Sequence, residues 1–487
     1  MNSTADAPQR AASGEAAQPA PLSGEAPEAV SRAQFLRLFS AVVVPMFLAV
    51  VDQTLLATAT PSIARDLGGL RDATWIALGY MIAMTVSAPL YGRLGDRYGR
   101  RDMLLLAMAL FCAGSLVCGI AGSLFVLIGG RVLQGLGGGG LIVLSQAMVG
   151  EIVPPRQRGR FQGYFATNYS LASIGGPIIG GLIVHHASWR WLFWANLPLC
   201  LLAAWRLRRL PQMHSLDARG WSDVPGALLF ALATSVTLIW MSFSGHRFAW
   251  FSAASALLFA GAAALWLVLA RRELRHEEPF LPVELLRDPA VLRMVVTVVC
   301  FGACMFSLVF FLPIFLQLGR GHDARESGLL LLPVTIGIVV GATLTGRLIA
   351  RFGRPAVMPM AGMSLSAAAL ALMAVLPLQP AQLGATCFAC GIGMGSVMPT
   401  AQIVVQYLAG RERLGAATAI VSLARATGAA LGTALFGAVV FALVPGIQPG
   451  SAPAEVTIGA FRAAFGGAAL VALAGAWVAS RIRRLRI

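Results

Sequence analysis

The sequence predicts an all-α protein that crosses a membrane many times, and three observations support this prediction. Of its 487 residues, 57% are hydrophobic and 12% are charged, and the mean hydropathy is +0.75. A soluble chain of this length needs far more charged surface. Apolar stretches of about 20 residues, long enough to cross a hydrocarbon core, recur from Leu36 almost to the C-terminus. The arginines gather in alternate connecting segments, as they do in chains that thread back and forth through a membrane.

The N-terminal segment, residues 1–33, has a different composition. It is rich in Ala, Pro, Gly, Ser and Glu and almost without large apolar side chains. Such a segment buries too little surface to offset its chain entropy, so we predict a disordered cytoplasmic tail. It lacks a basic start followed by a short apolar core and therefore does not resemble a cleavable signal peptide.

The rest of the chain predicts fourteen helical spans. Connecting segments such as "GRLGDRYGRRD", "PPRQRGR" and the terminal "RIRRLRI" are basic, whereas "GIAGS" and "LPLQP" carry no arginine. This alternation places both termini in the cytoplasm, which requires an even number of spans. The expected spans are 38–63, 73–92, 103–121, 124–150, 160–184, 190–206, 225–243, 249–270, 289–316, 327–349, 356–377, 381–407, 414–442 and 456–480.

The net charge of +16 follows from this topology and requires no nucleic-acid partner. Every basic residue is arginine, since the chain has no lysine, and Ala and Gly are abundant. That usage fits a GC-rich coding bias, and it favours the inner membrane of a bacterium as the location.

Two similar stretches indicate an internal repeat. "GRLGDRYGR" at 92–100 closes the second expected span and "GRLIARFGR" at 346–354 closes the tenth, and the two align without a gap. Asp96 of the first copy is matched by Ala350 of the second. Repeated bundles in parallel orientation are an arrangement of secondary transporters. The predicted division is a six-helix bundle at 34–207, two inserted helices at 208–288 and a second six-helix bundle at 289–487.

Charges inside the expected spans are candidate functional residues, because each costs about 2.5–3.5 kcal/mol at a helix centre. Asp52 is the deepest carboxylate, roughly 20 Å from the cytoplasmic end of its span. We interpret it as a site for proton coupling or for a cation; a permanent salt bridge with Arg131 or Arg425 is the alternative. Arg425 is a candidate for cavity closure or for binding substrate anions, and Arg462 for anchoring. Further candidate cavity residues are Gln53, Gln146 and Asn168.

Other sites are not expected. The seven cysteines lie in apolar stretches and are predicted to be free thiols. The glycine runs "GLGGGG" and "GIGMG" lie within spans rather than after a strand, so they do not predict a nucleotide-binding loop. We therefore expect neither a cofactor nor a metal. Without an ATP-binding loop, we expect transport to be driven by an ion gradient. The six histidines are scattered among loops, unlike the clustered set that an enzyme requires.

Four motifs, each on the appropriate span, resemble those of the major facilitator superfamily, and in particular those of its fourteen-span drug:proton antiporters. The loop motif G-x-L-x-D-R-x-G-R-R is matched by Gly92, Leu94, Asp96, Arg97, Gly99, Arg100 and Arg101. The fourth-span motif R-x-x-Q-G is matched by Arg131, Gln134 and Gly135. The fifth-span antiporter motif is matched by Gly163, Gly176, Pro177, Gly180 and Gly181, with Ala172 in place of one glycine. The first-span motif D-x-T…P is matched by Asp52, Thr54 and Pro61.

This resemblance implies a fold of two six-helix bundles with two inserted helices. It also implies that Arg131 is the partner or the proton-relay neighbour of Asp52, and that the loop around Asp96 latches the halves together in the outward-open state. The expected function is export of small amphipathic or cationic compounds in exchange for protons. The alternatives are an exporter or symporter of an endogenous metabolite or peptide and, less favoured, a polytopic enzyme or sensor. Expected partners are the small-molecule substrate, protons and membrane lipid; a periplasmic adaptor and an outer-membrane channel stay open.

Overall fold

The computed structural model describes most of the chain from residue 32 onward as α-helix. The described residues are 32–67, 74–153, 155–210, 223–244, 248, 252–276, 280, 283–321, 324–377, 379–410, 413–444 and 454–482. Residues 1–31, the greater part of the predicted tail, lie outside them.

The first seven helices form one group in space. Ser123 caps the fourth helix by accepting a hydrogen bond from the Val126 amide at 3.3 Å. Gly99 turns the chain between the second and third helices with φ 94°, a conformation that favours glycine. These helices are α1 (Arg32–Leu67), α2 (Thr74–Tyr98), α3 (Arg100–Gly119), α4 (Leu124–Ile152), α5 (Pro155–His186), α6 (Trp191–Trp194) and α7 (Asn196–Arg208).

The last helices form a second group. The break within the pair α15 and α16 falls at Ser396, and α11 continues into a short π-helix, η2 (Phe315–Gly319). The helices are α10 (Val283–Arg287), α11 (Pro289–Ile314), α12 (Ala324–Leu329), α13 (Leu332–Phe352), α14 (Val357–Val375), α15 (Pro380–Gly395), α16 (Val397–Ala409), α17 (Leu414–Leu443) and α18 (Ala454–Ser480).

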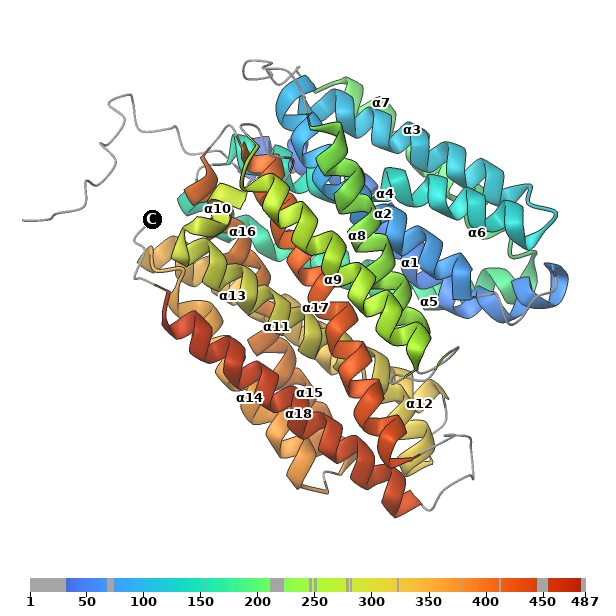
Figure 1. Cartoon of the computed structure of the whole chain (residues 1–487), viewed down its shortest axis with the longest axis vertical. Coiled ribbons are helices and arrows are strands. Elements are labelled where there is room, and N and C mark those ends of the chain that lie inside the picture. Colours follow the sequence, from blue (N-terminus) through green and yellow to red (C-terminus); the bar gives the residue numbers. More distant parts are fainter. Residues whose placement is uncertain are drawn as a thin grey trace, which may run out of the picture.

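Each group has its own hydrophobic core. One buried cluster runs from Phe35 to Leu207 and a second from Ala290 to Ile482. In Figure 1 the blue and cyan helices lie on one side and the orange and red helices on the other. The two groups contact each other where α2 packs against α17 and α5 against α13.

Two helices connect the groups in the sequence, α8 (Val224–Phe243) and α9 (Ala253–Glu273), and they pack against each other. In Figure 1 they run between the two groups, and α8 contacts both α2 and α17. Asp223 fixes the start of α8: it accepts hydrogen bonds from the Gly226 amide at 2.8 Å and from Arg272 at 2.9 Å. Burial disfavours its charge, but Arg272 and the backbone amides hold the pKa of Asp223 below its usual range.

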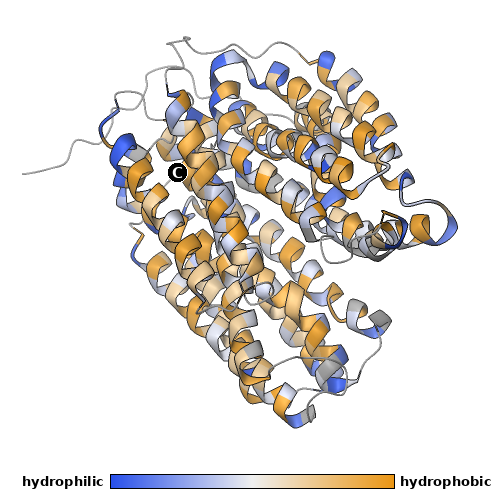
Figure 2. Cartoon of the chain, turned by 45° about the vertical axis from the view of Figure 1, so that its right-hand side comes forward, coloured by the Kyte–Doolittle hydropathy of each residue, from blue (hydrophilic) through white to orange (hydrophobic). Residues whose placement is uncertain are grey.

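Twelve helical segments of the described residues are long and apolar enough to cross a membrane, so the chain is a multi-pass membrane protein. Figure 2 shows apolar residues along the helices and hydrophilic residues concentrated near their ends. The structure supports twelve of the fourteen predicted spans. The other two, at 160–184 and 190–206, fall on α5 and on α6 with α7, where a break at Ala195 leaves helices of 4 and 13 residues.

Candidate functional site

Asp52 and Arg131 form an ion pair inside the first group of helices. Asp52 lies on α1 and Arg131 on α4, and the Arg131 Nη1 group donates to Asp52 Oδ2. The two residues are only 2% and 1% exposed. Of the two partners expected for Asp52, the structure selects Arg131.

Three further polar side chains complete this site. Gln134, one turn after Arg131, donates to Asp52 Oδ1 at 2.9 Å and to Ser115 Oγ on α3 at 2.8 Å. Asn196, at the start of α7, donates to the same Asp52 oxygen at 3.2 Å. The carboxylate is therefore held by side chains of α4 and α7, all within the first group.

Arg131 is also held by groups other than carboxylate. Its guanidinium lies 4.2 Å from the centre of the Tyr80 ring, and its Nε donates to the Ile76 carbonyl at 3.3 Å. The Tyr80 hydroxyl in turn donates to the Ala49 carbonyl at 3.0 Å. Cation–π contact and hydrogen bonds offset part of the desolvation of the buried charge. Tyr80, Ser115 and Asn196 were not among the predicted site residues.

Asp96 joins the two groups of helices. Its Oδ1 accepts from the Gly415 amide at 3.0 Å and its Oδ2 from the Ala416 amide at 3.2 Å. These amides belong to the first turn of α17, where backbone N–H groups have no partner within the helix. Arg100 donates to the same carboxylate at 2.6 Å and forms a second ion pair with Glu151 on α4.

The glycines and the other arginines of this loop have distinct contacts. A Cβ on Gly92 would lie 2.6 Å from the Gly415 carbonyl, so the crossing of α2 and α17 requires glycine there. Arg101 donates to the Arg208 carbonyl at 3.2 Å. The Arg97 guanidinium lies 4.8 Å from the ring of its neighbour Tyr98, so in this conformation Arg97 does not contribute to the Asp96 contact.

The motif on α5 packs against α1 and α13. A Cβ on Gly176 would lie 1.9 Å from Thr54 Oγ1, and one on Gly163 2.5 Å from Thr343 Oγ1 of α13. Thr54 also donates to the Ala172 carbonyl at 3.2 Å. Gly180 is buried, whereas Gly181 has open space where a Cβ would lie. Pro177 lies within α5, and its side chain is outside the described part of the structure.

A glutamine cluster forms a second contact between the groups. Gln402 of α16 donates to Gln146 of α4 at 2.7 Å. Gln406, one turn later, donates to Gln402 at 3.2 Å and to Thr418 of α17 at 2.9 Å. It accepts from Arg158 of α5 at 3.3 Å. This cluster thus joins α4 and α5 to α16 and α17.

The remaining candidate cavity residues do not meet at one site. Gln53 donates to the Met84 sulfur at 3.4 Å. Asn168 is 5% exposed, and its amide nitrogen has no hydrogen-bond partner among the described residues. Arg425 is half-buried on α17, with its guanidinium 5.8 Å from the Phe306 ring.

The cysteines and acidic residues form no further site in the part of the chain that is described. All seven cysteines are free, five of them buried. No group of three or more His, Cys, Asp or Glu among the described residues is arranged to hold a metal ion.

Two helical bundles with a buried charged pair in one of them, joined by polar contacts between them, define a membrane transporter of the two-bundle class. Residues 43–433 match the family model of the Major Facilitator Superfamily. The chain belongs to this family, whose members transport small molecules and are not enzymes.

Relatives are found in bacteria. An uncharacterised transporter of Mycobacterium tuberculosis is 33% identical over 395 residues, which cover 81% of this chain and 58% of the relative. The multidrug transporter protein MdtP of Bacillus subtilis is 32% identical over 394 residues, covering 80% of this chain and 72% of MdtP. The chain thus spans less than two thirds of the length of the mycobacterial relative.

Solved structures share the fold. The human organic anion transporter MFSD10 superposes with a TM-score of 0.63 at 16% identity, over 91% of this chain and 99% of that one. The proton:xylose symporter XylE superposes with a TM-score of 0.60 at 14% identity, over 90% and 95% of the two chains. At these identities the likeness shows the fold alone.

Proposed function

We propose that this protein exports small amphipathic or cationic compounds across the inner membrane of a bacterium in exchange for protons. The observation that carries the proposal is the buried pair of Asp52 and Arg131, since ionisable residues within the membrane mark ion and proton pathways. The name of the Bacillus subtilis relative, a multidrug transporter, supports this class of substrate.

Protonation of Asp52 is the coupling step in this proposal. Asp52 and Arg131 neutralise each other, so a proton on Asp52 leaves Arg131 as an uncompensated buried charge. Removing one partner of a buried ion pair costs about 3–5 kcal/mol. The site can therefore bind a proton only if the surrounding helices rearrange, and this requirement links proton binding to a change of shape.

The contacts of α1 with α5 connect this rearrangement to the second bundle. Thr54, half a turn after Asp52, donates to the Ala172 carbonyl and packs on Gly176 of α5. Because α5 also packs on α13 of the second group, a shift of α1 changes the packing between the two bundles. The antiporter motif on α5 supports exchange rather than symport.

The contacts of Asp96 and of the glutamine cluster hold the cytoplasmic ends of the bundles together, so we assign this conformation to the outward-facing state. Rocking the bundles apart at this end breaks both contacts and opens the path from the cytoplasm, as alternating access requires. The loop around Asp96 is then a latch, and Gly92 allows the close approach of α17.

We further propose fourteen spans, with both termini in the cytoplasm. α5 packs along α1 and α13, two candidate spans, and α7 packs along α1 and α3, and this packing supports the proposal that both cross the membrane. The two separate hydrophobic cores support a six-helix bundle on each side of the inserted pair α8 and α9.

The alternative is symport or export of an endogenous metabolite or peptide. The buried pair of Asp52 and Arg131 could couple protons to either of these as well. XylE, which shares the fold, is named a proton:xylose symporter. The direction in which an imposed proton gradient drives substrate separates exchange from symport.

The test is gradient-driven transport in proteoliposomes with a panel of lipophilic cations, neutral drugs and anions. Wild-type protein is expected to accumulate at least one cationic or amphipathic compound inside the vesicles in exchange for protons that leave them. The Asp52→Asn variant is expected to reduce this accumulation to that of empty vesicles. Asp66→Asn is the matched control, because Asp66 lies on the same helix in an exposed ion pair with Arg190. Normal coupled transport by Asp52→Asn would exclude this carboxylate as the coupling site.

A further inference from the structure

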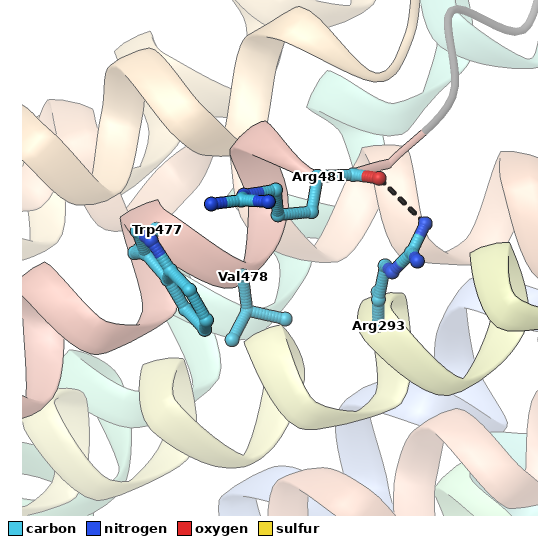
Figure 3. Close-up of a pocket in the computed structure, with 4 residues that line it drawn as sticks. All are labelled: Arg293, Trp477, Val478 and Arg481. Carbon is cyan, nitrogen blue, oxygen red and sulfur yellow. Dashed lines mark hydrogen bonds between the residues drawn. The ribbon is translucent and has the colours of Figure 1, made fainter.

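A basic pocket lies at one end of the second bundle, between the start of α11 and the end of α18. It has a volume of about 480 Å³ and is lined by Arg293 near the start of α11 and by Trp477, Val478 and Arg481 at the end of α18. Figure 3 shows Arg293 facing the end of α18, with Val478 between it and Trp477. The lining contains two arginines and no carboxylate.

Each arginine side chain contacts the end of α18. Arg293 Nη1 donates to the backbone carbonyl of Arg481 at 2.6 Å, the dashed line in Figure 3. The Arg481 guanidinium lies 5.1 Å from the centre of the Trp477 ring. Capping of the α18 C-terminus explains Arg293 alone. It does not explain the second arginine or the exposed indole beside it.

An apolar strip extends from the pocket along the surface. Leu470, Leu473 and Trp477 lie on one face of α18 and are 68%, 52% and 61% exposed. Leu292 and Val296 of α11, which packs against α18, are 46% and 38% exposed. A cationic pocket at a helix end, an aromatic ring at the same level and an exposed apolar strip below match the phosphate, the interface and the acyl chains of a phospholipid.

We propose that this pocket, the Arg293–Arg481 pocket, binds the headgroup of an anionic phospholipid whose acyl chains lie along α18 and α11. The proposal does not depend on the coupling of transport to protons. In the sequence, Arg481 is followed by Arg483, Arg484 and Arg486, so the C-terminal segment is basic.

The test is native mass spectrometry of the purified full chain, supplied with phosphatidylglycerol or with phosphatidylcholine. Wild-type protein is expected to retain phosphatidylglycerol in preference to phosphatidylcholine, and the variant R293Q/R481Q to bind it about thirtyfold more weakly. This magnitude follows because each arginine near an anionic headgroup contributes about 1 kcal/mol and about 1.4 kcal/mol is a tenfold change in affinity. The R293K/R481K variant keeps both charges and is expected to recover most of the binding.

Arg209→Gln is the matched control. Arg209 is an exposed arginine at the end of α7, 3.7 Å from the Trp205 ring, so the change removes the same kind of contact elsewhere. Equal loss of phosphatidylglycerol in this variant and in R293Q/R481Q would reduce the effect to general surface charge and overturn the proposal. Displacement of the lipid by millimolar inorganic phosphate would also overturn it, since it would make the site a free-phosphate site.

Folding of the variants is controlled separately. Arg481→Gln alone leaves in place the backbone carbonyl that Arg293 binds, so the end of α18 keeps its cap. This single variant is expected to bind phosphatidylglycerol about fivefold more weakly, the equivalent of about 1 kcal/mol. Unchanged lipid binding by a single variant that runs as wild type in gel filtration would refute the pocket.

Discussion

Asp96→Asn is expected to weaken the latch between the bundles in a way that can be measured at two backbone amides. The Gly415 and Ala416 amides lie in the first turn of α17, where no carbonyl of that helix is available to them. Both donate to the Asp96 carboxylate. Their protection from hydrogen exchange therefore reports closure of the latch.

The magnitude follows from the charge and burial of this contact. The Asp96 side chain is 12% exposed and that of Arg100 is 6% exposed, so solvent screens the contact weakly. A carboxylate at a partly buried helix N-terminus contributes up to about 2 kcal/mol. Asparagine keeps the size, but it is neutral and directs an NH₂ donor toward other donors. A loss of about 2 kcal/mol corresponds to roughly thirtyfold more opening.

The assay is hydrogen exchange of the purified protein, read on peptides that begin α17. Asp96→Asn is expected to speed exchange there by about thirtyfold and to slow turnover, with substrate binding largely intact. Asp102→Asn is the matched control, because Asp102 is an exposed acid in the first turn of α3. Exchange at α17 within twofold of that control would refute the latch.

Two further changes test the packing and the electrostatics. Gly176→Ala places a methyl group 1.9 Å from Thr54 Oγ1 and is expected to destabilise the protein by about 1–3 kcal/mol. Gly181→Ala is the control, because its methyl group meets open space and should leave the melting temperature within a degree or so of wild type. Equal melting temperatures of the two variants would contradict the described packing. Because its pKa is lowered on folding, Asp223 contributes stability that is complete above the ordinary value of 3.8 and is lost as the pH falls below it. Asp223→Asn should therefore lower the melting temperature at pH 7 and flatten its fall on acidification, as measured by thermal unfolding in detergent between pH 3 and 7; an unchanged acid profile would remove Asp223 from this role.

The sequence predicted the charged residues of the candidate sites better than it predicted the polar residues that hydrogen-bond to them. Asp52 and Arg131 stand out because a charge in an apolar stretch is rare, and the family motif paired them. Nothing in the local pattern marks Ser115 or Asn196, since a single small polar residue is common in a span. They join the site because helix packing brings α7 beside α1, and α3 beside α4 and α7.

The same limit applies to the contacts between bundles. The loop motif identified Asp96, but its partners are backbone amides more than 300 residues later in the chain, and amides carry no signal in a sequence. The role of Gln146 as a cavity residue stays a prediction, and the sequence did not indicate the hydrogen bond that its side chain accepts from Gln402 across the bundles. The number of spans was the least secure prediction, because α5 begins with several arginines and α6 and α7 are broken at Ala195.

The two halves of the repeat have diverged in their charges and not in their backbone. Gly99 and its counterpart Gly353 both have positive φ, 94° and 61°, so the turn is retained. The acid is not retained: the position of Asp96, which bonds to α17, is occupied in the second copy by Ala350, which is exposed.

The same difference holds at the proposed coupling site. Asp52 lies forty residues before Gly92, and forty residues before Gly346 the chain has Phe306. Both acids therefore belong to the first bundle, and the second bundle supplies the N-terminus of α17 and a half-buried Arg425 beside Phe306. Under the proposed mechanism, protonation changes the packing of the first bundle. The second bundle then responds through α13, which packs on α5, and through α17 at the proposed latch.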